Sequence, residues 1–180
     1  MLREKKLMNV SNILENKIRI SGFIEESIVD GHGIRFVVFT QGCKKRCNGC
    51  HNPETQPLCG GYLMDMEELV AIWEKNPLLK GITISGGEPF LQSKKCAYLA
   101  RKAKKSGLDV VVYSGYYFEE LIKDENDEAL SLLRVCDVLI DGPFEIEKKG
   151  LGLGFKGSSN QRVINLNETL KGNKIILLND

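Results

Sequence analysis

Residues 39–53 read Phe39-Thr40-Gln41-Gly42-Cys43-Lys44-Lys45-Arg46-Cys47-Asn48-Gly49-Cys50-His51-Asn52-Pro53, with three cysteines in the spacing C-x3-C-x2-C. The preceding run, residues 35–40, is rich in β-branched and aromatic side chains, which is typical of a buried strand. Gly42 follows directly, and glycine commonly marks the end of a strand. We therefore predict a loop carrying Cys43, Cys47 and Cys50 at the carboxyl end of a buried strand.

Clustered thiolates bind soft metals, and cysteine is the usual ligand of iron–sulfur clusters. Three cysteines would leave one iron of a [4Fe-4S] cluster without a protein ligand. By analogy with zinc sites, such an open position marks a reactive centre. The alternative is a structural zinc site with His51 or Cys59 as the fourth ligand. His51 directly follows Cys50, so binding one ion with both would strain the backbone, whereas Cys59 is free to reach back.

Length and composition limit the classes of protein that the chain can belong to. Its 180 residues suit one domain with a real core, and its net charge of +1 predicts no nucleic-acid partner. We find neither a signal peptide nor an apolar run long enough to cross a bilayer, so we expect no membrane partner. The six cysteines of such a chain predict reduced thiols in the cytoplasm.

The periodicity of apolar residues predicts alternating strands and helices. We expect residues 1–16 to form a polar N-terminal arm and residues 17–180 to form the domain. Strands are predicted at 17–24 on a sheet edge, and at 35–40, 81–85, 108–113, 137–140, 163–166 and 174–178. Helices are predicted from an N-cap at Asp65 to about 76, at 92–106 before a stop at Gly107, and at 118–133 with a break near 124–127. This alternation indicates an α/β fold, a single-domain partial (β/α) barrel with mostly parallel strands.

Three unusual loops follow predicted strands. In parallel α/β folds, chemistry gathers at the carboxyl ends of the strands, so these loops predict one site. They are the cysteine loop, Ser85-Gly86-Gly87-Glu88-Pro89 and Ser114-Gly115-Tyr116. Paired glycines let a ligand approach the main chain closely, and the carboxylate could hold an ammonium group. The alternative is a tight strand-to-helix turn with Glu88 in the first helical turn.

These motifs resemble a known family. The cysteine spacing followed by Gly-Gly-Glu resembles the radical S-adenosylmethionine (SAM) superfamily. Residues 30–35, Asp-Gly-His-Gly-Ile-Arg, and residues 50–52, Cys-His-Asn, resemble the activases of glycyl-radical enzymes. Residues 141–144, Asp-Gly-Pro-Phe, and residues 156–161, Lys-Gly-Ser-Ser-Asn-Gln, are similar to the activating proteins of anaerobic ribonucleoside-triphosphate reductase. The resemblance runs from about residue 18 to the end of the chain.

The resemblance implies two cofactors, a [4Fe-4S] cluster and SAM, in a radical SAM fold. The cluster ligands would be Cys43, Cys47 and Cys50, with the open iron chelating SAM. The residues around SAM would be Gly86, Gly87 and Glu88 at its ammonium group, Gly49 and His51 beside the cluster and Cys50, and Ser114 and Gly115 by its ribose. Many members carry an aromatic residue before the third cysteine, where this chain has Gly49.

The resemblance also implies an oxidoreductase reaction. The reduced cluster would cleave SAM, and the resulting 5′-deoxyadenosyl radical would take hydrogen from a glycine of anaerobic ribonucleoside-triphosphate reductase. The electron would come from a donor such as flavodoxin or ferredoxin. One alternative is an activase of another glycyl-radical enzyme, of the pyruvate formate-lyase type. Another is a small-molecule enzyme of the 7-carboxy-7-deazaguanine synthase type, a family that usually has a longer stretch between its first two cysteines.

Several further residues have simple expected roles. Cys96 and Cys136 fall on apolar faces and are expected in the core, and Cys59 is expected to be a loop thiol. Residues 44–46, Lys-Lys-Arg, are expected to be solvated. The alternative role for these three cations is the docking of an acidic electron carrier.

Overall fold

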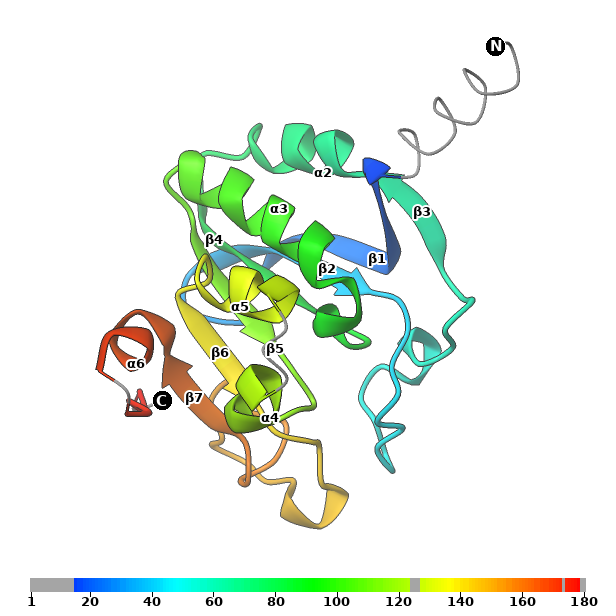
Figure 1. Ribbon diagram of the computed structural model, residues 1–180. Coiled ribbons are helices and arrows are strands. Elements are labelled where there is room, and N and C mark those ends of the chain that lie inside the picture. The colour runs from blue at the N-terminus through cyan, green and yellow to red at the C-terminus, as the bar shows by residue number, and fades with distance from the viewer. Residues whose placement is uncertain (1–14, 124–126, 173, 179–180) are drawn as a thin grey trace.

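In the computed structural model, residues 15–123, 127–172 and 174–178 are described. Most of the predicted polar arm therefore lies outside the described residues. Seven strands form one sheet in the order β3-β1-β2-β4-β5-β6-β7 (Figure 1). Their bounds are β1 Lys17–Ser27, β2 Ile34–Thr40, β3 Tyr62–Asp65, β4 Leu79–Gly86, β5 Asp109–Tyr113, β6 Val138–Asp141 and β7 Arg162–Asn165.

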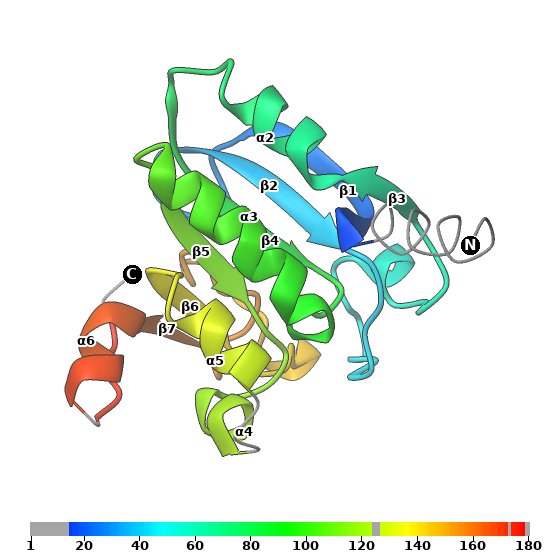
Figure 2. The same cartoon turned by 45° about the horizontal axis from the view of Figure 1, so that its top comes forward.

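Helices cover one face of this sheet. The α-helices are α2 Met66–Trp73, α3 Ser93–Lys105, α4 Phe118–Lys123, α5 Asp127–Leu133 and α6 Leu166–Gly172. Short 3-10 helices are η1 Pro53–Thr55, η2 Pro89–Gln92 and η3 Ile146–Lys148. Figures 1 and 2 show α2, α3 and α5 side by side on the same face, with α6 beside β7.

The centre of the sheet is parallel and its flanks are antiparallel. Strands β2, β4, β5 and β6 run parallel, whereas β1, β3 and β7 pair antiparallel with their neighbours. This open sheet with helices between its central strands confirms the predicted α/β class. The carboxyl ends of the four parallel strands meet at one edge of the sheet, as the sequence predicts for the three unusual loops.

One strand position was predicted wrongly. Strand β1 is not an edge strand, because β3 pairs with it from Lys17↔Asp65 to Ile20↔Tyr62. Strand β3 has only four residues, two of them exposed, and therefore lacks the alternation that identifies a strand.

The two faces of the sheet have different cores. The helix-facing core includes Phe36, Ile82, Val110 and Trp73. The opposite face carries a smaller cluster of Val111, Ile140 and Val163, against which Phe155 packs. Successive residues of a strand point to opposite faces, so the valines of β5 are divided between the two cores. Burial on both faces explains why the central strands are almost continuously apolar.

The local helix signals are confirmed where they were strongest. Asp65 caps α2 by accepting a hydrogen bond from the Glu67 amide at 2.9 Å, and Gly107 ends α3 with φ +76°. Helices α4 and α5 lie on either side of residues 124–126, which are outside the described residues. The predicted strand at 174–178 is wrong, because only Leu177 forms a bridge, to Ile164, and α6 occupies the predicted polar turn before it.

Within the described residues, no helix has the length and apolar character required to span a membrane.

Candidate active site

The cysteine loop, residues 42–52, leaves the carboxyl end of β2 and is held at its base by the segment that follows it. The Gly42 amide donates to the Thr55 carbonyl at 2.7 Å, and the Cys43 amide donates to the Gln56 carbonyl at 3.0 Å. Cys43, Cys47 and Cys50 are all half-buried. Burial raises the pKa of the Cys43 thiol, although hydrogen bonds from the backbone of Lys45 and Arg46 oppose that rise. The loop therefore presents three thiols from a fixed base.

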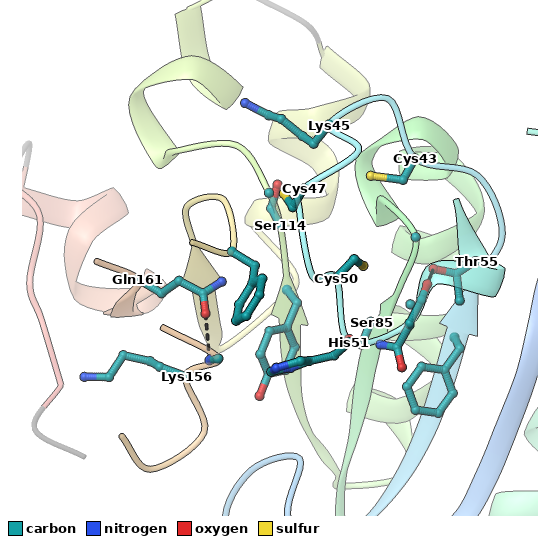
Figure 3. Close-up of a pocket in the computed structure, with 18 of the residues that line it drawn as sticks. Cys43, Lys45, Cys47, Cys50, His51, Thr55, Ser85, Ser114, Lys156 and Gln161 are labelled. Atoms are coloured by element: carbon teal, nitrogen blue, oxygen red, sulfur yellow. Dashed lines mark hydrogen bonds between the residues drawn. The ribbon is translucent and has the colours of Figure 1, made fainter. Parts of the chain in front are cut away.

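All three cysteines line one cavity of about 400 Å³. Figure 3 shows them and His51 in succession along the loop, with Gln161 and Lys156 coming from the connection between β6 and β7. Other walls come from the ends of the neighbouring parallel strands: Ser85, Gly86 and Gly87 at the end of β4, Tyr113, Ser114 and Gly115 at the end of β5, and Gly142 and Phe144 after β6. The predicted convergence of the strand-end loops is therefore present.

The chemistry of the donor set fits an iron–sulfur cluster. The iron atoms of a cluster occupy separate corners, so each thiolate binds a different iron, and three half-buried thiols along one cavity wall suit that arrangement. Across the described residues, no three side chains of histidine, cysteine, aspartate or glutamate gather closely enough to hold a single metal ion. The two candidates for a fourth zinc ligand are placed differently: the His51 ring packs on Phe144 at 4.5 Å between centroids, and Cys59 is exposed and does not line the cavity.

Gly86 and Gly87 are glycines because the backbone before the cysteines lies against them. A Cβ at Gly86, where φ is +95°, would lie 2.6 Å from the Phe39 backbone, and a Cβ at Gly87 would lie 2.3 Å from the Gly42 oxygen. The Gly87 amide also donates to the Thr40 carbonyl at 2.7 Å. Only glycine lets the two strand-end loops approach this closely.

Glu88 lies beneath the cavity. It is fully buried, and its carboxylate accepts hydrogen bonds from the Ser114 hydroxyl at 3.0 Å, the Gly115 amide at 2.9 Å and the Phe90 amide at 3.2 Å. The last of these caps η2, so Glu88 stands at the start of a short helix. Burial raises the pKa of Glu88 to about 7, and its hydrogen-bond donors hold it from rising further. The carboxylate thus ties the loop after β4 to the loop after β5.

Comparison with known proteins agrees with this geometry. The family described as 4Fe-4S single cluster domain matches residues 29–164. An anaerobic ribonucleoside-triphosphate reductase-activating protein of Vibrio cholerae is 34% identical over 142 residues, covering 74% of this chain and 89% of that protein. A pyruvate formate-lyase-activating enzyme of Clostridium pasteurianum is 34% identical over 128 residues, covering 66% of this chain and 54% of that enzyme.

The chain belongs to the radical SAM family of activating enzymes. Among solved structures, the crystal structure of QueE from Escherichia coli matches with a TM-score of 0.44 and 16% identity, covering 55% of this chain and 53% of that one.

The β6–β7 connection, residues 142–161, forms a further wall of this activating enzyme's cavity. Gln161 holds the connection together: its Oε1 accepts from the amides of Gly157 at 2.7 Å and Ser158 at 3.2 Å, and its Nε2 donates to the Gly142 carbonyl at 2.9 Å. The Tyr113 hydroxyl donates to the Phe155 carbonyl at 2.8 Å, which fixes the connection over β5.

The same connection contacts the cysteine loop of the activating enzyme. The Phe144 ring lies on His51, and a Cβ at Gly49 would lie 2.5 Å from Ile146 Cδ1. Gly49, with φ +68°, therefore leaves room for Ile146. Of the residues predicted around SAM, Gly49 and Glu88 do not line the cavity, whereas Cys50, His51, Gly86, Gly87, Ser114 and Gly115 do.

Sequence reasoning did not identify the cavity residues of the connection, among them Phe144, Phe155 and Gln161. The glycine-rich run 150–157 and the polar run 156–161 were the available signals for a loop that packs back on the sheet. The expectation that residues 44–46 are all solvated is wrong for Lys45, whose side chain is 23% exposed and is paired with Glu120.

Proposed function

We propose that this activating enzyme cleaves SAM reductively and generates a glycyl radical on anaerobic ribonucleoside-triphosphate reductase. The observation that carries the proposal is the single cavity shared by three thiols and the ends of four parallel strands. The relative in Vibrio cholerae bears the name of that reductase's activating protein and is covered over 89% of its length.

Cys43, Cys47 and Cys50 would hold a [4Fe-4S] cluster in the proposed enzyme. When bound, such a cluster supplies one electron to the sulfonium of SAM, whose C–S bond breaks to give methionine and a 5′-deoxyadenosyl radical, which becomes 5′-deoxyadenosine on taking hydrogen from a glycine Cα. The chain's own residues would bind the cluster and SAM and orient them. Gly86 and Gly87 offer main chain at the cavity wall, and their lack of side chains lets this wall lie against the backbone that leads into the cysteine loop.

The remaining site residues would position SAM. Ser114 and Gly115 line the cavity directly above buried Glu88, whose carboxylate fixes both of them. In the proposed complex these two residues lie by the ribose and His51 packs beside the cluster. Glu88, which is fully buried and does not line the cavity, would serve the ammonium site by holding Ser114 and Gly115 in place. A rigid wall matters because a misplaced radical would attack the wrong atom.

We further propose a cytoplasmic reaction with an acidic one-electron donor such as flavodoxin or ferredoxin. All six cysteines are free, and free thiols persist in a reducing compartment. Lys44 and Arg46 are exposed on the cysteine loop and would face such a donor. No nucleic acid takes part in this scheme.

The experiment combines anaerobically reconstituted protein, a reductant, SAM and the candidate reductase. We expect 5′-deoxyadenosine together with a glycyl doublet in the electron paramagnetic resonance spectrum of the reductase. Cleavage of SAM without a doublet would overturn the choice of partner, and a protein that takes up no iron would overturn the reaction.

A second candidate partner is a pyruvate formate-lyase, because a pyruvate formate-lyase-activating enzyme is also 34% identical. The same experiment with both candidate proteins, at equal concentrations, decides between them. The glycyl doublet will form on the reductase under our proposal and on the lyase under the alternative.

A further inference from the structure

Lys45 lies within the cysteine loop, between the first two cysteines, but does not point freely into solvent. Its Nζ is 3.4 Å from Glu120 Oε1 of α4 and 4.0 Å from the centroid of the Tyr116 ring. Its neighbours Lys44 and Arg46 are exposed. Figure 3 shows the Lys45 side chain extending from the cysteine loop toward the adjacent helix. Of these three consecutive cationic residues, Lys45 is therefore the one whose side chain contacts another element of the fold.

The stem of Lys45 packs on the turn between β5 and α4, residues 114–117. A Cβ at Gly115 would lie 3.1 Å from Lys45 Cγ and 3.5 Å from Glu88 Oε2. Gly115 thus leaves room for both Lys45 and Glu88, and the Gly115 amide donates a hydrogen bond to the Glu88 carboxylate. A continuous set of contacts joins the cysteine loop, the β5–α4 turn and the loop after β4.

This side of the cysteine loop has few other attachments. The backbone bonds to Thr55 and Gln56 hold only its beginning, at Gly42 and Cys43. Within the part of the chain that is described, the amides of residues 44–46 donate no hydrogen bond to the backbone of another element. The Lys45 side chain therefore tethers the span between Cys43 and Cys47 to the rest of the fold.

We propose that Lys45 is a positioning residue that fixes the Cys43–Cys47 span against the β5–α4 turn through Glu120 and Tyr116. A preformed loop loses less conformational freedom when it binds a ligand. The role of Lys45 toward a bound cluster rests on the proposed function, whereas its role in ordering the loop does not.

The test compares Lys45→Gln with the matched variant Lys44→Gln. After anaerobic reconstitution, we expect Lys45→Gln to release iron to a ferrous chelator about fivefold faster than the parent, equivalent to about 1 kcal/mol. Lys44→Gln should match the parent. Glu120→Gln should accelerate release similarly, and Lys45→Arg, which keeps the charge and the ring contact, should restore slow release. Equal release from Lys45→Gln and Lys44→Gln would overturn the cluster role.

Hydrogen exchange on the iron-free protein separates this inference from the proposed function. We expect the amides of residues 43–47 to exchange faster in Lys45→Gln than in Lys44→Gln, because the tether needs no cluster. A parent protein that binds no iron would defeat the proposed function and leave this measurement to decide the role of Lys45. Unchanged exchange in both variants would overturn the tether.

Discussion

The Glu88 carboxylate accepts a hydrogen bond from the Gly115 amide at 2.9 Å, so the loop after β4 is hydrogen-bonded directly to the loop after β5. Ser114 adds a second bond to the same carboxylate, and Phe90 a third. A fully buried carboxylate with three donors is costly to disturb, because each donor would lose its partner. Two walls of the cavity consequently depend on one side chain.

This burial predicts a distinctive dependence of stability on pH. The pKa of Glu88 rises from 4.5 to about 7 on folding, so the folded state binds more protons than the unfolded state between these values. The contribution of Glu88 to the free energy of unfolding is therefore complete below pH 4.5 and is lost as the pH rises through 7. Lys45 is the charged side chain that acts on it, and it lowers the pKa of Glu88.

The variant Glu88→Gln cannot titrate at this position. Between pH 5 and pH 8, the free energy of unfolding of the parent should fall relative to that of Glu88→Gln by about 2–3 kcal/mol. Urea denaturation of the iron-free proteins at both pH values measures this difference. Parallel pH profiles for the two proteins would show that Glu88 keeps an ordinary pKa in the fold.

The cysteine loop and the central strands could be predicted because their signals are local. Gly42 and the cysteine spacing lie within a dozen residues, and the apolar runs of β2, β4 and β5 identify buried strands wherever they pack. The partners of Glu88 could not be predicted, because Ser114 and Gly115 meet it only through the parallel pairing of β4 with β5. The cavity wall of residues 142–161 was missed for the same reason, since contacts such as His51–Phe144 join distant parts of the chain.

Gly87 offers a test of the close approach between the loop after β4 and the cysteine loop. In Gly87→Ala the new Cβ would meet the Gly42 oxygen at 2.3 Å, and this backbone atom can move only with the cysteine loop. We expect a loss of about 3 kcal/mol in the free energy of unfolding, together with impaired iron uptake. Urea denaturation and iron analysis give both quantities.

Gly107→Ala is the control for Gly87→Ala. Gly107 has φ +76° but nothing within 4 Å of an added Cβ, and it lies away from the cavity at the end of α3. Gly107→Ala should lower the free energy of unfolding by about 1 kcal/mol, from backbone conformation alone, and should leave iron uptake complete. If the two variants lose equal stability and bind equal iron, the contact of Gly87 with Gly42 is unimportant.

The six cysteines divide into two groups for the third prediction. Alanine at Cys43, Cys47 or Cys50 should remove most of the bound iron and abolish 5′-deoxyadenosine formation. Cys59→Ala should keep the parent's iron content, because this thiol is exposed and does not line the cavity. Iron analysis and the absorbance of the reconstituted proteins test the assignment. Loss of metal from Cys59→Ala would instead point to a four-cysteine site.

Gln161 and Asn160 are adjacent residues whose side-chain amides make different numbers of hydrogen bonds. Gln161 makes three hydrogen bonds within the β6–β7 connection, whereas Asn160 makes one, from Nδ2 to the Pro143 carbonyl at 2.8 Å, and its buried Oδ1 has no partner among the described residues. Gln161→Ala would leave the amides of Gly157 and Ser158 unpaired, so it should lower the free energy of unfolding by about 2 kcal/mol. Asn160→Ala loses one bond but also removes an unpaired acceptor, so its cost should stay below about 1 kcal/mol.

Hydrogen exchange at the Gly157 and Ser158 amides shows whether the connection itself is affected. Both amides should exchange faster in Gln161→Ala and at the parent's rate in Asn160→Ala, because only Gln161 accepts their hydrogen bonds. His51 should also lose order in Gln161→Ala, since its ring packs on Phe144 of the same connection. Equal exchange in the two variants would mean that the other contacts of the connection, such as the Tyr113 hydrogen bond to the Phe155 carbonyl, hold its shape without Gln161.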